Sequence, residues 1–254
     1  MAAANSGEMV LHLPTFLDFL AEKLGLDMHH AYFWDVELKY CVPLIMSFLV
    51  GCTLVLFSMY ATRRMEKIPR GAQAFVELVV EGAYNFLHDM LGKHTARYLP
   101  FFCTLFFFIL AMNLWGLIPL MESPTHYMNT TLSMAIVVFV MYNFEGLRIK
   151  KLGYFKHFFE PIFLAPLMFP LHVIGEFVRP ASLSIRLYGN LTGEGLTLAV
   201  LVFLTPWIFG NIPVPLHLFM VLLALLFSTI QATIFTMLSS VYLSLAIEEH
   251  EEGH

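Results

Sequence analysis

One run of the sequence, residues 216–247, most constrains the fold because it contains no Lys, Arg, Asp or Glu. A helix that spans a bilayer needs roughly 20 predominantly apolar residues. Residues 41–60, 99–121 and 125–144 reach this length, and residues 161–209 form a further hydrophobic region that four charges interrupt. Since residues 216–247 exceed the length of a perpendicular helix, we expect strong tilt or an extension past the membrane.

The composition supports a membrane location. Of the 254 residues, 58% are hydrophobic and 13% are charged, and the mean hydropathy is +0.72. Soluble domains carry about 25% charged residues. We therefore predict an all-α integral membrane protein with about five membrane-spanning helices. An N-terminal extracytoplasmic segment, residues 1–40, would precede one membrane domain, residues 41–254.

The sequence lacks the common motifs of ligand-binding and catalytic sites. It contains no Gly-rich phosphate loop, nucleophile elbow or HExxH pair. None of its three cysteines forms a CxxC pair. The net charge of −5, without a basic patch among exposed aromatics, disfavours nucleic acid. We expect no metal, no cofactor and no directly bound nucleotide.

Residues 74–90 predict an amphipathic helix at the membrane interface. Apolar residues recur at spacings of three, four and seven, and polar residues take the opposite face. The apolar set is Phe75, Leu78, Val79, Phe86 and Met90, and the polar set is Glu77, Glu81, Asn85 and His88.

Basic residues predict the orientation, because cytoplasmic loops carry an excess of Lys and Arg. Clusters of Lys and Arg follow the first and third predicted spans, at residues 63–70 and 148–156. Residues 122–124 and 210–215 contain no Lys or Arg. The N-terminus is therefore expected outside and the C-terminus in the cytoplasm, after five crossings.

Polar residues form a stripe along residues 172–194. At about 100° per residue, all of them fall on one face about 80° wide. This stripe comprises His172, Glu176, Arg179, Arg186, Asn190 and Glu194. The last predicted helix carries a second stripe, which comprises His217, Ser228, Gln231, Ser239 and Tyr242. Two long helices thus each bring polar groups through a hydrophobic layer.

Of these groups, Arg186 has the largest free-energy cost of placement in a membrane. An arginine in mid-membrane costs about 2.5–3.5 kcal/mol, and it stays charged because its pKa is above about 12. It cannot release a proton, but it can hold a nearby carboxylate in the ionised form. The carboxylate is either Glu194, two turns away on the same face, or a group on another subunit.

Structural interpretations remain open for five of the polar residues, because Arg186 can also snorkel or form a structural ion pair. Arg179 can form a structural ion pair, and His217 can be an interfacial histidine. Gln231 can make an ordinary interhelical hydrogen bond, and Asn113 can satisfy backbone groups beside Pro119.

Three segments resemble the a subunit of F-type ATP synthase. They are "RPASLSIRLYGN", "MNLWGLIP" and "QATIFTMLSSVYLSLAIEEH". The resemblance covers roughly residues 41–254. It matches Arg186 to the family's essential arginine and Asn190 to the family's asparagine one turn later. It also matches Gln231 to the glutamine of the family's last helix, and Arg179 to a basic position two turns before the arginine.

The chain departs from the family pattern at three places. Members commonly carry an acidic residue or histidine where this chain has Gly195, with Glu194 one position earlier. A common glutamate is His172 here, and a histidine of some members is Ala224.

The resemblance implies a function for these residues. The chain would be the stator subunit of a proton-transporting two-sector ATPase in a bacterial inner membrane. Its two long tilted C-terminal helices would pack against a ring of c subunits, and a b-subunit peripheral stalk would complete the assembly. Arg186 would meet the ring carboxylate and block a proton short-circuit between two half-channels. The proton-path candidates are Glu194, Asn190, Gln231, His217, Glu176 and His172, with Arg179, Asn113 and Tyr242 in supporting roles.

Two other functions compete with this one. A secondary transporter or ion channel acting alone would use Arg186 to bind an anion, although no inverted repeat is recognisable in the sequence. A structural membrane scaffold would tolerate neutral substitutions along the stripe without losing ion flux.

Overall fold

The computed structural model describes residues 32–33, 36–63, 71–118, 121–150, 165–209 and 216–248. Apart from one antiparallel pair of two-residue strands, β1 (Tyr32–Phe33) and β2 (Val36–Glu37), and short turns beside the helices, these residues are helical. The long helices are α2 (Leu38–Thr62), α3 (Ala72–Leu91), α4 (Thr95–Trp115), α5 (Met128–Lys150), α7 (Ala165–Phe209) and α8 (Leu216–Glu248). Short 3-10 turns, η1 (Gly92–His94) and η2 (Pro124–His126), precede α4 and α5. The all-helical prediction is thus confirmed for the described part of the chain.

Among the residues that the structure describes, four helical stretches are long and apolar enough to cross a membrane. They are Val42–Thr62, Val76–Trp115, Met128–Ile149 and Val221–Ile247. The second stretch joins α3 to α4 through η1. The charged α7 is not among them, so the expected count of five remains a prediction.

The predicted span at residues 99–121 was too long at its end. Helix α4 ends at Trp115, where Leu117 N–H donates to the Leu114 carbonyl at 3.0 Å and Ile118 N–H donates to the Trp115 carbonyl at 3.2 Å. These bonds reach back three residues and tighten the last turn instead of continuing the helix.

Helix α5 extends further at its C-terminal end than predicted. It was expected over residues 125–144, and it begins at Met128 and continues to Lys150. The continuation carries a charged residue, Glu145, into the helix at only 8% exposure. Glu145 is tolerated there because it forms ion pairs with Arg97 and Arg148.

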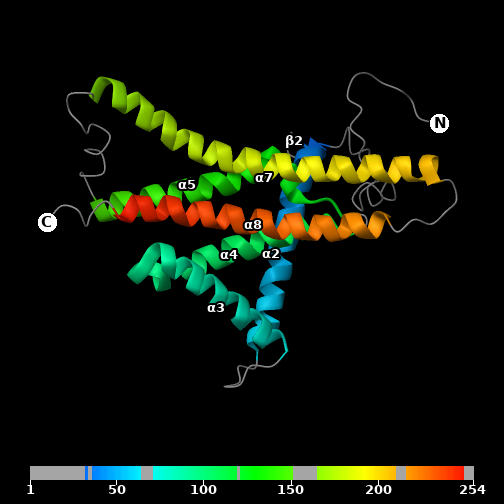
Figure 1. Cartoon of the computed structure of the whole chain (residues 1–254), viewed down its shortest axis with the longest axis horizontal. Coiled ribbons are helices and arrows are strands. Elements are labelled where there is room, and N and C mark those ends of the chain that lie inside the picture. Colours follow the sequence, from blue (N-terminus) through cyan, green and yellow to red (C-terminus); the bar gives the residue numbers. More distant parts are fainter. Residues whose placement is uncertain are drawn as a thin grey trace.

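Helices α7 and α8 run antiparallel as the two longest elements (Figure 1). Helices α4 and α5 pack against them, and α2 crosses their common direction steeply in Figure 1. The strong tilt or extension expected for residues 216–247 relative to a membrane stays a prediction. Their shared core contains Phe102, Ile109, Met112, Val138, Leu183, Leu187, Ala232 and Phe235.

The amphipathic helix is present as α3, and its place at a membrane interface stays a prediction. The helix lies between Gly71 and Gly92, which have φ values of 61° and 50°. Its buried side chains are Leu87 and Leu91. The residues Leu78 and Phe86, predicted on the apolar face, are exposed at 69% and 36%. The fully buried side chains of α3 therefore lie in its last turns, and Val76, Val79 and Val80 nearer its start are half-buried.

The two termini were also assigned structure or location from the sequence. Residues 1–31 and the acidic tail after Glu248 lie outside the described residues.

Candidate functional site

Arg186 lies on an exposed side of α7. The neighbouring Leu183 and Leu187 are buried at 2% and 0% exposure, and they direct another side of the helix into the core. Within the described part of the chain, the Arg186 guanidinium makes no ion pair or hydrogen bond. Glu194, which is half-buried, is not paired with it. Of the two partners left open by the sequence, the internal one is therefore not used.

Small residues surround Arg186 on this exposed face. At about 100° per residue, Gly175, Ser182, Gly189 and Gly193 fall within about 60° of it around α7. All four are exposed. A methyl group built at any of the three glycines meets no atom within 4 Å. The face leaves the α7 backbone open to close approach by another helix.

Asn190 and Gln231 join α7 to α8. The Asn190 Nδ2 donates to Gln231 Oε1 at 2.7 Å. Gln231 is 4% exposed, and its Nε2 is buried without a hydrogen-bond partner in the described region. Gln231 thus makes an interhelical hydrogen bond, which is one of its two interpretations. Its partner Asn190 lies one turn along α7 from Arg186.

Arg179, by contrast, is paired within the chain. Its Nη1 contacts Glu176 Oε1, and its guanidinium lies over the Tyr242 ring at 5.4 Å from the ring centre. The Tyr142 hydroxyl donates to the second oxygen of Glu176 at 2.8 Å. The structural ion pair considered for Arg179 is therefore present, and it ties α7 to α5 and α8.

Asn113 connects three elements. Its Nδ2 donates to the Ser228 carbonyl of α8 at 3.4 Å, and its Oδ1 accepts from Thr125 Oγ1 of η2 at 3.0 Å. Ser123 Oγ lies 2.6 Å from Thr125 Oγ1 and donates to the Met112 carbonyl at 2.7 Å. The Asn113 side chain thus makes interhelical contacts of α4, and Pro119 lies outside the described residues.

The remaining candidates are the two histidines. His172 is half-buried on α7, two turns before Arg179. His217 lies at the start of α8, and its side chain is outside the described residues. The structure therefore brings together Asn190 with Gln231 and Glu176 with Arg179 and Tyr242, while Asn113 lies in a separate polar cluster.

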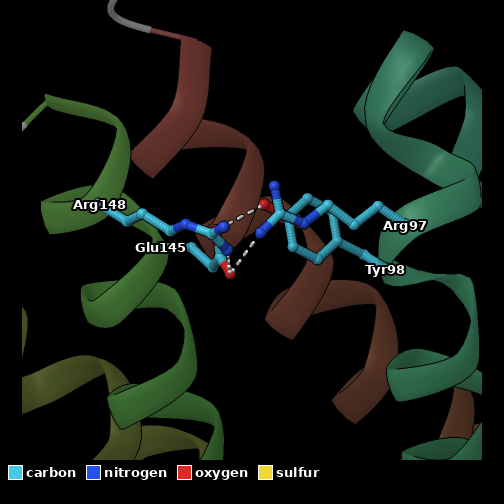
Figure 2. Close-up of polar contacts among 4 residues, drawn as sticks. All are labelled: Arg97, Tyr98, Glu145 and Arg148. Carbon is cyan, nitrogen blue, oxygen red and sulfur yellow. Dashed lines mark hydrogen bonds and ion pairs between the residues drawn. The ribbon is translucent and has the colours of Figure 1, made fainter.

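One polar cluster was missed by the sequence analysis. Figure 2 shows Glu145 and Arg148 of α5 facing Arg97 and Tyr98 of α4. Glu145 Oε1 accepts from Arg97 Nη2 at 3.1 Å and from Arg148 Nη1 at 3.5 Å. The Tyr98 hydroxyl donates to Oε2 at 3.0 Å. The spacing of Glu145 and Arg148, three apart on one helix, was the available signal.

Known proteins match the chain over most of its length. The family model described as ATP synthase A chain matches residues 44–244. The ATP synthase subunit a of Solidesulfovibrio magneticus is 38% identical over 237 residues, which cover 91% of this chain and 94% of that protein. The ATP synthase subunit a of Campylobacter curvus is 43% identical over 210 residues, with coverages of 80% and 89%.

A third relative, the ATP synthase subunit a of Trichlorobacter lovleyi, is 38% identical over 241 residues, with coverages of 94% and 99%. The family-model match runs through α4, α5 and α7 and most of α8, the helices that build the polar site. The chain is thus a member of the ATP synthase A chain family, the subunit a proteins of bacterial ATP synthases.

Proposed function

We propose that this chain is the proton-translocating stator subunit of an F-type ATP synthase, with Arg186 facing a carboxylate on a rotating ring of c subunits. The observation that carries the proposal is the exposed Arg186 without a partner among the described residues. A cation on an apolar helix costs about 2.5–3.5 kcal/mol at mid-membrane. A carboxylate from another chain, within a few ångströms, would offset that cost.

The surroundings of Arg186 suit a moving helical partner. Membrane helices approach closely where small residues line the interface. Gly175, Ser182, Gly189 and Gly193 provide such a surface beside the arginine. Large side chains there would lock a neighbour in place, whereas small ones let successive copies of a partner pass.

Arg186 then performs two tasks. It stabilises the ionised carboxylate of the ring, because an opposite charge lowers a carboxyl pKa by about 1–3 units. It also stays protonated itself, since an arginine side chain does not release its proton in proteins. A proton therefore cannot cross directly from one half-channel to the other through Arg186, and the ring has to rotate before its carboxylate is reprotonated.

Polar groups beside Arg186 would line the two half-channels. Glu194 and His217, with Gln231, are assigned to the outward path, and Asn190 connects this path to the arginine. Gln231 Nε2, Ser228 Oγ and Thr192 Oγ1 are buried without partners among the described residues. Buried polar atoms of this kind are satisfied by water, which a proton path requires. Glu176 and His172 remain candidates for the second path.

The orientation and partners complete the proposal. Residues 1–40 would lie outside a bacterial inner membrane, residues 41–254 would form the membrane domain, and the C-terminus would be cytoplasmic. A b-subunit peripheral stalk would hold the chain against the torque of the ring. Nucleotide chemistry belongs to other subunits.

The test replaces Arg186 with Ala in the assembled complex and measures ATP-driven proton pumping in inverted membrane vesicles. Arg63→Ala, an exposed arginine beyond the end of α2, is the matched control. We expect Arg186→Ala to abolish pumping and Arg63→Ala to pump normally. Pumping at the unmodified rate by Arg186→Ala contradicts the proposal.

Purification separates the proposal from a transporter that acts alone. A stator subunit should co-isolate with an ATPase and a small proteolipid ring. A chain that purifies by itself and carries an anion across liposomes would support the transporter.

A further inference from the structure

His126 lies against α7 at the position next to Glu194. It is the last residue of η2, on the connection between α4 and α5, and it is half-buried. A methyl group built at Gly195 would lie 3.3 Å from His126 Cε1 and 3.5 Å from His126 Nε2. The imidazole therefore occupies the space that a side chain at residue 195 would fill.

A buried polar route runs from this connection toward the arginine. Thr125, next to His126, donates to Asn113, and Asn113 donates to the Ser228 carbonyl. Gln231, one turn further along α8, accepts the hydrogen bond of Asn190. Thr125, Asn113 and Gln231 are 0%, 3% and 4% exposed. Two hydrogen-bonded groups, one at Asn113 and one at Gln231, thus lie in turn between η2 and the helix that carries Arg186.

Histidine is suited to passing a proton along such a route. Its unperturbed pKa is about 6.5, and its two ring nitrogens can accept a proton on one side and release one on the other. Adjacent residues on a helix point about 100° apart. A ring that covers Gly195 therefore lies about 100° around α7 from the Glu194 side chain, and the proposed exchange between the two groups runs through water.

We propose that His126 is a proton-relay residue of the outward half-channel and exchanges protons with Glu194. The neutral imidazole takes a proton from the outer aqueous side and becomes an imidazolium. It then releases the proton from its other nitrogen, through water, to the Glu194 carboxylate, which becomes a carboxylic acid. The ring returns to its neutral form, so no net charge stays on the connection. This inference rests on the proposed function.

The competing explanation is packing, because an imidazole that covers a glycine can simply fix η2 against α7. His126→Phe separates the two roles, since it keeps a ring over Gly195 but cannot carry a proton. His126→Ala removes the ring and opens space for added imidazole. Blotting of the purified complex shows whether each variant assembles.

The experiment measures ATP-driven proton pumping by the assembled complex in inverted vesicles, with and without added imidazole. We expect both variants to pump at least several-fold more slowly, and imidazole to raise the rate of His126→Ala only. His126→Phe pumping at the unmodified rate, or no effect of imidazole on an assembled His126→Ala complex, overturns the relay.

A swap keeps the test decisive if His126→Phe does not assemble. The double variant His126→Ala with Gly195→His moves the imidazole onto α7, where only the His126 ring lies within 4 Å of the new side chain's first atom. Recovery of pumping supports the relay, and a rate equal to that of His126→Ala refutes it.

The Arg186→Ala variant separates a failure of the His126 relay from a failure of the proposed function. If it abolishes pumping while the His126 variants pump normally, only the relay fails. If it pumps normally, the proposed function fails first.

Discussion

Removing the Glu145 carboxylate should loosen the contact between α4 and α5. Three groups hold this side chain: Arg97 at 3.1 Å, Arg148 at 3.5 Å and the Tyr98 hydroxyl at 3.0 Å. Glu145→Ala leaves the Tyr98 hydroxyl, on a residue only 3% exposed, without its acceptor. The two arginines return to water more easily, because their side chains are already 47% and 58% exposed.

The expected loss of stability follows from this difference between the buried tyrosine and the exposed arginines. A buried hydrogen bond to a charged group contributes about 1.5–3 kcal/mol. A solvent-exposed ion pair contributes about 0–1 kcal/mol. We therefore expect Glu145→Ala to lower the free energy of unfolding by roughly 2–4 kcal/mol. Glu145→Gln keeps an acceptor for Tyr98, and it should cost about half as much.

The assay is unfolding of the purified chain in mixed micelles by an increasing mole fraction of SDS. Glu81→Ala is the control, because Glu81 is exposed on α3. A surface substitution of this kind changes stability by less than about 0.5 kcal/mol. If Glu145→Ala is as mild as Glu81→Ala, the buried Tyr98–Glu145 bond does not stabilise the fold and the reasoning is wrong.

Two further predictions concern the packing of α4 and the contact of α7 with α8. Gly116→Ala should lower the amount of folded chain in membranes, because its methyl group would lie 2.9 Å from Ser123 Cβ. The control Gly82→Ala should not lower it, because a methyl group there has nothing within 4 Å. Equal yields of the two variants would contradict this prediction. Asn190→Leu and Gln231→Leu should each slow proton pumping, and the double variant should be no slower than the slower single variant, because both break one hydrogen bond. Losses that multiply in the double variant would show that the two amides act separately.

Much of the architecture follows from the sequence, because a membrane leaves few alternatives. An apolar run of sufficient length can satisfy its backbone only as a helix, so α2, α5, α7 and α8 were predictable from hydropathy. The stripe on α7 followed from the helical period, and Arg186 stood out because its cost in an apolar layer is high.

Contacts between helices were not predictable in the same way. Asn113 meets Ser228 across 115 positions of the chain, and Arg97 meets Glu145 across 48. No local pattern encodes which turns of two helices face each other. The same limit applies to His126 and Gly195, which meet only because η2 packs on α7.

Helix ends were also less predictable than helix cores. Hydropathy continues past Trp115, yet the chain turns there through bonds that reach back three residues. Hydropathy stops before Glu145, yet α5 continues because three side chains compensate that charge. In both cases, polar contacts decide the boundary rather than the apolar run.

Passive proton leak tests the central claim most directly. The complex is reconstituted in liposomes with an imposed pH gradient and no nucleotide, and the decay of the gradient is followed. If Arg186 is the barrier between two half-channels, the unmodified complex holds the gradient and Arg186→Ala dissipates it several-fold faster. An Arg186→Ala complex that is fully assembled and holds the gradient as well as the unmodified one would contradict the account.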